Sequence, residues 1–317
     1  KRFWKINQDE NMKLDAIVGN PPYQVMGDNN NRSLPIYHLF VDLAKRITNH
    51  YSSLIIPARW YTSSILQGDF TQRMLDDRSI SKLVDYSNAT DCFPSVEIKG
   101  GICYYLSNKK YNGTCCIEVH HGSNIYKSNR FLKTEGIDAF VRFSQSLSVV
   151  EKVKTLNFVS FANIVSSQNP FGFNSKVVGS KDSTKGDVII LSKFRTVGYI
   201  NPDEITLRKD YIHKWKVMTP IAGEGGTLPH RVTGRPFTSK PGECCNGTYM
   251  VIGPFENQEV CENVVGYLNG KFARFMVSIV QNTQNTKSDS YRLVPLQDFP
   301  RPWTDADLYA KYGLTDE

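Results

Sequence analysis

The sequence lacks several features that would place it in a class directly. No run of 18 apolar residues occurs, so neither a transmembrane helix nor a membrane partner is expected. The six histidines show no metal-ligand spacing, and the cysteines contain no C-x-x-C motif, so no metal site is predicted. The cysteines are odd in number, which does not indicate a disulfide framework. Reduced, mostly buried thiols are expected at Cys92, Cys103, Cys115, Cys116, Cys244, Cys245 and Cys261.

The sequence also has no starting methionine and no signal peptide. It opens on Lys1-Arg2-Phe3-Trp4, which is polar at its start. We interpret the chain as a fragment of a longer protein that works in the cytoplasm.

The charge is unevenly distributed along the chain. Residues 1–110 hold 14 basic and 11 acidic side chains, residues 111–302 hold 23 and 16, and the segment from Trp303 holds 1 and 4. A mildly basic protein with solvated lysines has the same total charge. The excess in residues 111–302 nevertheless makes this region the best candidate for a surface that binds a polyanion.

The first third of the chain alternates between strand and helix patterns. A short apolar segment, residues 14–19, ends at Gly-Asn-Pro-Pro and predicts a buried strand. Alternation of this kind predicts an α/β fold with a mainly parallel sheet, whose last two strands form an antiparallel end. The remaining elements are expected at residues 37–47 (helix), 53–57 (strand), 69–77 (helix, capped by Asp69), 80–86 (strand) and 98–106 (strand).

Beyond about residue 108 the segments become shorter and rich in Tyr, Phe, Ser and Asn, which indicates a second, mixed α+β domain. We therefore expect one domain over residues 1–125 and another over residues 126–317. In the second, helices are expected at residues 134–155, 256–280 and 304–313, strands at 188–191 and 250–252, and a long exposed loop at 223–243.

The tetrapeptide Asn20-Pro21-Pro22-Tyr23 carries the chemistry. An exocyclic adenine amino group is a poor nucleophile because its lone pair is delocalised into the ring, so alkylation requires acceptors for both N–H bonds. Asn20 offers a side-chain carbonyl and Pro21 a main-chain carbonyl. The prolines restrict the backbone, and Tyr23 adds a flat ring. A simple strand-to-loop turn explains the same residues, since Asn-Pro is common in turns.

Ile17-Val18-Gly19-Asn20-Pro21-Pro22-Tyr23 resembles the catalytic motif of the adenine-N6 DNA methyltransferases of restriction–modification systems. The resemblance implies a Rossmann-like methyltransferase sheet and transfer of a methyl group from S-adenosylmethionine to a flipped adenine in a specific DNA site. It assigns catalysis to Asn20, Pro21, Pro22 and Tyr23, with the Asn and the first Pro carbonyl binding the amino group and the Tyr stacking on the base.

Three further segments match the same family in the same order. Residues 34–40 contain Tyr37 and His38 and resemble the segment that lines the cofactor and base pocket. Residues 53–60 resemble the next strand and its Pro-containing end. Residues 92–101 resemble the later motif whose Phe, here Phe93, packs on the other face of the base.

One departure concerns the cofactor. The family places a Gly-rich loop for S-adenosylmethionine upstream of the catalytic motif, and no residue before Asn20 fits it. We therefore expect an incomplete cofactor site, an inactive fragment and an open sheet edge. The missing N-terminal part, or a restriction subunit, becomes an expected partner.

The second domain resembles the target-recognition region of these enzymes, so double-stranded DNA is the expected substrate. Arginine and lysine bind phosphates, and arginine also reads guanine edges. The candidate DNA contacts are Lys193, Arg195, Lys214, Lys216, Arg231, Arg235 and Lys240.

Three alternatives remain. RNA or a protein glutamine is an alternative methyl acceptor, since related Asn/Asp-Pro-Pro-Tyr sites serve those substrates. Glu97 and Lys99 have the E-x-K spacing of metal-dependent restriction nucleases, with Asp85 or Asp91 as a second carboxylate. A DNA-recognition module without catalytic activity is the third alternative, because the cofactor loop is missing.

Overall fold

The computed structural model describes residues 13–26, 33–62, 69–96, 98–222, 232–281 and 285–315. The chain divides into two compact units, Lys1–Ser144 and Gln145–Glu317, called unit 1 and unit 2 below. The domain boundary expected after residue 125 falls inside a strand of unit 1, so the compact unit extends further along the chain than the sequence pattern indicated.

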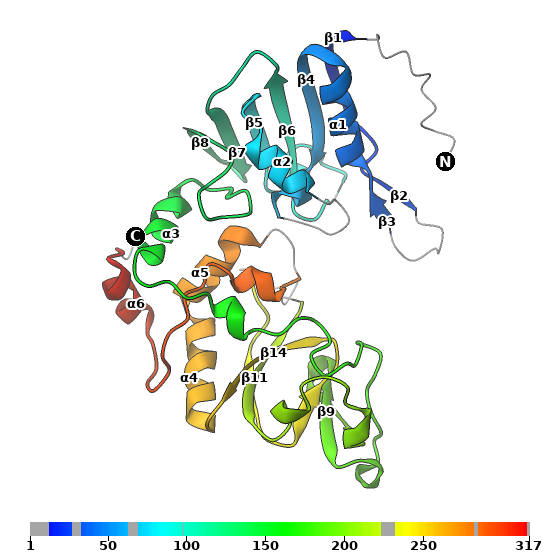
Figure 1. Cartoon of the computed structure of the whole chain (residues 1–317), viewed down its shortest axis with the longest axis vertical. Coiled ribbons are helices and arrows are strands. Elements are labelled where there is room, and N and C mark those ends of the chain that lie inside the picture. Colours follow the sequence, from blue (N-terminus) through cyan, green and yellow to red (C-terminus); the bar gives the residue numbers. More distant parts are fainter. Residues whose placement is uncertain are drawn as a thin grey trace. The chain divides into compact units, whose positions relative to one another are not determined.

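Unit 1 is built on a six-stranded mixed sheet in the order β1-β4-β6-β5-β7-β8 (Figure 1). β1 pairs with β4 and β5 with β7 in parallel, whereas β6 is antiparallel to both of its neighbours and β8 to β7. The α/β class and the antiparallel pairing of β5 with β6 are confirmed, but the sheet is mixed rather than mainly parallel. The strands are β1 (Leu14–Gly19), β4 (Thr48–Pro57), β5 (Ile80–Tyr86), β6 (Ile102–Asn108), β7 (Cys115–His121) and β8 (Asn124–Arg130); β2 (Gln24–Met26) and β3 (Ser33–Pro35) form a separate antiparallel pair.

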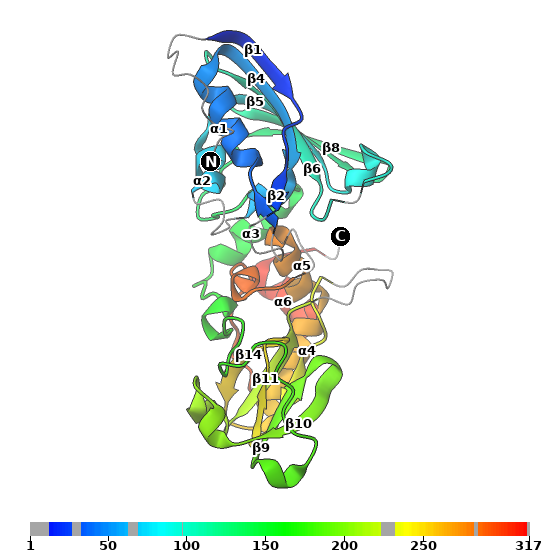
Figure 2. The same cartoon turned by 90° about the vertical axis from the view of Figure 1, so that its right-hand side faces the viewer.

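Two helices, α1 (Tyr37–Ile47) and α2 (Phe70–Asp76), lie over the same face of this sheet (Figures 1 and 2). α1 buries Tyr37, Val41 and Ala44, which recur at helical spacing and face the core. α2 begins after Asp69, as expected, but the Asp69 carboxylate makes no capping hydrogen bond and pairs with Arg73 instead. Short 3-10 turns follow β4 and β5, at η1 (Ala58–Tyr61) and η3 (Ala89–Asp91).

Unit 1 contains an ion pair between Asp85 and Arg142, a residue near the end of this unit. The Arg142 Nε lies 2.6 Å from Oδ2 of Asp85, a residue of β5 that is fully buried. The Tyr61 hydroxyl donates to the other Asp85 oxygen at 2.7 Å, and Phe140 belongs to the same core. Burial raises the pKa of Asp85, and the Arg142 charge opposes that shift. Because these contacts hold Phe140 and Arg142 in the core of unit 1, the helix expected over residues 134–155 begins only at Gln145.

Unit 2 contains two three-stranded sheets, in the orders β10-β9-β13 and β12-β11-β14. Helix α4 contacts all three strands of the second sheet (Figure 1). The strands are β9 (Val188–Ser192), β10 (Thr196–Ile200), β11 (Trp215–Pro220), β12 (Phe237–Ser239), β13 (Glu243–Cys245) and β14 (Tyr249–Phe255). The helices are α3 (Gln145–Lys154), α4 (Gln258–Asn269), α5 (Lys271–Val280) and α6 (Asp305–Tyr312), and the 3-10 turns are η4 (Phe161–Ile164), η5 (Ser183–Lys185), η6 (Lys193–Arg195), η7 (Pro202–Glu204), η8 (Lys209–Tyr211) and η9 (Ser288–Tyr291).

The helical pattern over residues 256–280 is split into α4 and α5 at Gly270. The Asp305 carboxylate accepts hydrogen bonds from the backbone N–H groups of Lys271 and Phe272, at 3.0 and 2.9 Å. It thereby satisfies the first donors of α5, which a new helix leaves unpaired. The expected loop over residues 223–243 contains β12, and β13 begins at its last residue.

No helix among the described residues has both the length and the apolar character required to cross a membrane.

Replacing Arg142 with Met leaves the Asp85 carboxylate buried without its countercharge. We expect the free energy of unfolding, measured by urea denaturation, to fall by about 3–5 kcal/mol. The double variant Asp85→Asn/Arg142→Met should recover part of this loss. Lys133→Ala removes the exposed ion pair with Asp76 and serves as the control, with a loss below about 1 kcal/mol. A loss for Arg142→Met as small as that of the control would contradict the structural role of the pair.

Candidate functional site

The Asn20-Pro21-Pro22-Tyr23 tetrapeptide follows β1, the first strand in the order of the sheet. In the parallel pair of β1 and β4, Gly19 lies opposite Leu54, so the two strands end at the same side. β4 and β5 are both antiparallel to β6, so β5 also ends there. The segments that follow these three strands therefore all start at the carboxyl ends of the strands. Open α/β sheets bind ligands at this end.

The structure places the residues of the tetrapeptide in different environments. Asn20 and Pro22 are exposed, Pro21 is buried and Tyr23 is half-buried against the core of unit 1. The Tyr23 carbonyl accepts a hydrogen bond from Ile36 at 3.0 Å, which connects the tetrapeptide to the start of α1. Pro21 and Pro22 have no N–H that could compete for an acceptor. The Asn20 side chain is thus accessible, while the backbone after it is held in place.

Burial raises the pKa of Tyr23 to about 12, with smaller contributions from the nearby Cys103 and Cys92 thiols. The side chain is therefore a neutral phenol at physiological pH. Its hydroxyl is buried and has no hydrogen-bond partner among the described residues. Phe93 lies in the segment that follows β5, and β5 ends on the same side of the sheet as β1.

The segment after β5, residues 87–101, is held in place by hydrogen bonds and by close backbone packing. The Phe93 N–H donates to the Ala89 carbonyl at 2.8 Å, and the Arg142 guanidinium donates to the Gly100 carbonyl at 2.8 Å. Gly101 has φ +84°, and a Cβ atom there would lie 2.2 Å from the Tyr86 carbonyl oxygen, so a larger residue does not fit. The partly buried Arg142 thus positions the loop that holds Phe93, a role that its sequence context did not reveal.

The two residues expected to line the pocket differ in accessibility. Tyr37 is 1% exposed and packs edge-on against Phe70 in the core. His38 is half-buried, and its buried Nδ1 has no hydrogen-bond partner among the described residues. Burial lowers the pKa of His38, so the imidazole is neutral at physiological pH. The lining role of both residues stays a prediction.

The residues of the nuclease alternative do not form a metal site in the described part of the chain. Glu97 lies outside the described residues, Asp91 is exposed, and Asp85 is held by Arg142 and Tyr61. Among the described residues, no three His, Cys, Asp or Glu side chains are grouped so that they could hold a metal ion. His120 and His121 end β7 and bond to Glu118 and Ser87, respectively.

The candidate DNA contacts of unit 2 are only partly available at the surface. Lys193, Arg195, Lys214, Arg235 and Lys240 are exposed, and Arg231 lies outside the described residues. Lys216 is not available for the DNA contact expected of it, because it is 0% exposed. Its Nζ donates to the Lys214 and Lys240 carbonyls at 2.9 and 3.1 Å. It holds β11 to the chain after β12 and does not reach a phosphate.

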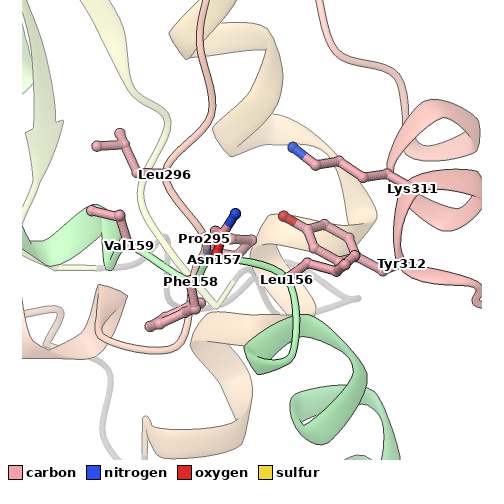
Figure 3. A pocket seen from close by; sticks show the side chains of 8 residues that line it. All are labelled: Leu156, Asn157, Phe158, Val159, Pro295, Leu296, Lys311 and Tyr312. Atoms are coloured by element: carbon pink, nitrogen blue, oxygen red, sulfur yellow. The ribbon is translucent and has the colours of Figure 1, made fainter.

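A cavity of about 410 Å³ lies elsewhere in unit 2 (Figure 3). Lys311 and Tyr312 of α6 line one side of it, and the Lys311 amine donates to Gln297 at 2.6 Å. None of the residues expected to act in catalysis or DNA binding lines this cavity, so it is not part of the candidate site. Its remaining lining residues are Leu156, Asn157, Phe158, Val159, Pro295 and Leu296.

Comparison with known proteins agrees with the motif. Residues 1–93 match the family model described as Eco57I restriction-modification methylase. A protein of Mycoplasma pneumoniae (strain ATCC 29342 / M129 / Subtype 1), described as an "uncharacterized adenine-specific methylase", is 36% identical over 112 residues, which cover 34% of this chain and 26% of that protein. These matches confirm the resemblance to adenine-specific methylases of restriction–modification systems over the first third of the chain. The chain spans about a quarter of the curated relative that it matches.

Two solved structures are also similar to the chain. The type IIG restriction endonuclease BpuSI shares 11% identity at a TM-score of 0.37, covering 96% of this chain and 49% of that one. The type IIL restriction-modification enzyme MmeI in complex with DNA shares 10% identity at a TM-score of 0.37, covering 87% and 45%.

Burial lowers the pKa of Lys216 to about 8, against an ordinary value of 10.5. Between these two pH values the unfolded chain keeps a proton on this amine that the folded chain has lost, so the contribution of Lys216 to the free energy of unfolding should rise with pH. We expect the free energy of unfolding of the wild type, minus that of Lys216→Met, to rise by at most about 3 kcal/mol when both proteins are denatured in urea at pH 7.5 to 10. Parallel pH profiles for the two proteins would refute the buried, shifted amine.

Proposed function

We propose that this chain is the adenine-binding and DNA-reading part of a site-specific DNA adenine-N6 methyltransferase of a restriction–modification system. The observation that carries the proposal is Asn20-Pro21-Pro22-Tyr23 directly after β1, at the edge where β4 and β5 also end. Residues 1–93, which contain this tetrapeptide, match the methylase family.

The proposed mechanism depends on two acceptors. The Asn20 side-chain oxygen and the Pro21 carbonyl oxygen each accept a hydrogen bond from one N–H group of the adenine amino group. These two hydrogen bonds turn the nitrogen lone pair out of conjugation with the ring. Tyr23 and Phe93 hold the extruded base between two rings, at an unstacking cost of a few kcal/mol. S-adenosylmethionine supplies the electrophilic methyl group when it is bound.

The described residues fit the base side of this site better than the cofactor side. β1 has no partner on its outer edge among the described residues, and Val18 in its middle is 82% exposed. A strand of a parallel α/β sheet is normally covered on both faces. We propose that further strands, including the Gly-rich cofactor loop, pair with this edge and are supplied by another part of the enzyme, in cis or from a partner subunit.

The DNA substrate is proposed from exposed basic side chains of unit 2. The exposed Lys193 and Arg195 lie together at one hairpin. A DNA-recognition module without catalysis remains the second candidate for the isolated chain, because the chain lacks the cofactor loop.

Asn20→Ala in the enzyme that contains the cofactor loop should abolish adenine methylation while leaving DNA binding within about twofold, because one of two acceptors for the amino group is lost. Incorporation of labelled methyl groups into DNA measures methylation, and gel shifts measure DNA binding. Asn124→Ala, an exposed asparagine at the start of β8, is the matched control and should methylate normally. Unchanged turnover in Asn20→Ala would refute the assigned role.

Calorimetric titration of the isolated chain with S-adenosylmethionine should show no saturable binding up to millimolar concentration, because the residues that would hold the adenosine are proposed to lie elsewhere in the enzyme. The enzyme with the cofactor loop serves as the positive control. Tight binding to the isolated chain would contradict the proposal of an incomplete cofactor site.

A further inference from the structure

The hairpin between β9 and β10 has an unusual turn. At its tip Phe194 has φ 59° and ψ 28°, and Arg195 has φ 58°. The Thr196 N–H donates to the Lys193 carbonyl, which closes a turn with two consecutive left-handed residues. Glycine and asparagine are the usual residues at such positions, and a bulky side chain there costs free energy. The turn therefore presents a phenylalanine at the expense of local stability.

The same turn is rigidly supported. The Arg195 N–H donates to the Tyr249 hydroxyl at 2.9 Å, and the Arg195 guanidinium lies 4.1 Å from the centre of the Phe237 ring. Phe237 and Tyr249 pack edge-to-face at 5.4 Å, and the Thr196 hydroxyl donates to the Lys193 carbonyl at 2.9 Å. Two aromatic side chains of the neighbouring sheet thus hold the backbone and the charged group of the tip.

The Phe194 side chain projects from this support into solvent. It is 86% exposed, the highest value among the large apolar side chains of the described residues. The Lys193 amine lies 4.9 Å from the centre of its ring, and Arg195 follows it, so an apolar group is flanked by two positive charges. Backbone strain that the surrounding structure holds in place is typical of functional sites, so the exposed ring is a candidate contact for another molecule.

We propose that Phe194 is a wedge that inserts between two stacked base pairs of duplex DNA, while Lys193 and Arg195 neutralise the phosphates on either side. Apolar side chains that enter base steps in this way unstack and kink the duplex. The flanking positive charges favour DNA over an apolar protein surface. This inference rests on the proposed function, since it assigns one contact of the DNA-reading unit, and it is separate from the clamp of Tyr23 and Phe93 around the target base.

The test uses the full chain and relaxed circular plasmid DNA, with gel shifts for affinity and topoisomerase relaxation for unwinding. Phe194→Gly is the informative variant, because glycine removes the wedge and also relieves the left-handed strain. We expect a higher melting temperature, roughly tenfold weaker plasmid binding and no unwinding. Phe194→Leu should retain most of the unwinding. Phe275→Ala removes a 39% exposed phenylalanine from α5 of the same unit and should behave as the wild type.

Several results would overturn the wedge. Wild-type protein that binds the plasmid without unwinding it, or Phe194→Gly that unwinds it fully, refutes insertion while the proposed function stands. Loss of self-association in Phe194→Gly by sedimentation, with DNA unwinding intact, assigns the ring to a contact between copies of the chain. Wild-type protein that binds no plasmid DNA refutes both the wedge and the DNA-reading role proposed for unit 2.

Discussion

The backbone after β1 can place two hydrogen-bond acceptors at a defined position only because two prolines follow Asn20 directly. Proline restricts the chain conformation and removes the N–H donors that would otherwise compete with a bound amino group. The parallel pairing of β1 with β4 then fixes where this short segment lies. The proposed base site, the surrounding loops and the fold of unit 1 all depend on that placement.

A second constraint acts on the loop that follows β5. Asp85 lies near the end of β5 and holds Arg142, and Arg142 holds the Gly100 carbonyl of the loop that contains Phe93. One charge pair therefore connects β5, the loop after β5 and the last residues of unit 1. A buried pair of this kind contributes little net stability but makes alternative loop positions costly, since each would leave a buried charge unpaired.

Much of unit 1 could be predicted from the sequence because its signals are local. The strand over residues 14–19 and the helix over residues 37–47 were expected at their observed bounds, since apolar spacing and the Gly-Asn-Pro-Pro break determine both. The motif order also indicated the resemblance to adenine-specific methylases, and the match over residues 1–93 confirms that resemblance. The mixed strand order depends on pairing across long loops, and no periodicity encodes it.

The errors in unit 2 have a common physical origin. Lys216 sits among basic residues in the sequence, yet its amine is buried and bonded to two carbonyls. The helix over residues 134–155 starts late because Phe140 and Arg142 pack into unit 1, and residues 256–280 split because Asp305 caps a new helix at Gly270. Each outcome depends on a partner distant in the chain. Phe194, by contrast, carried a sequence signal, since it stands between Lys193 and Arg195.

Methylation of the adenine amino group by this site is tested most directly by the product that it leaves in DNA. DNA should be isolated from a host that lacks adenine methylation and expresses the enzyme containing this chain, then digested to nucleosides and separated by mass. We expect N6-methyldeoxyadenosine in this DNA, and we expect none in DNA from cells that carry Asn20→Ala. Methylated cytosine, or unmodified DNA from cells with the folded wild-type enzyme, would contradict adenine methylation by this site.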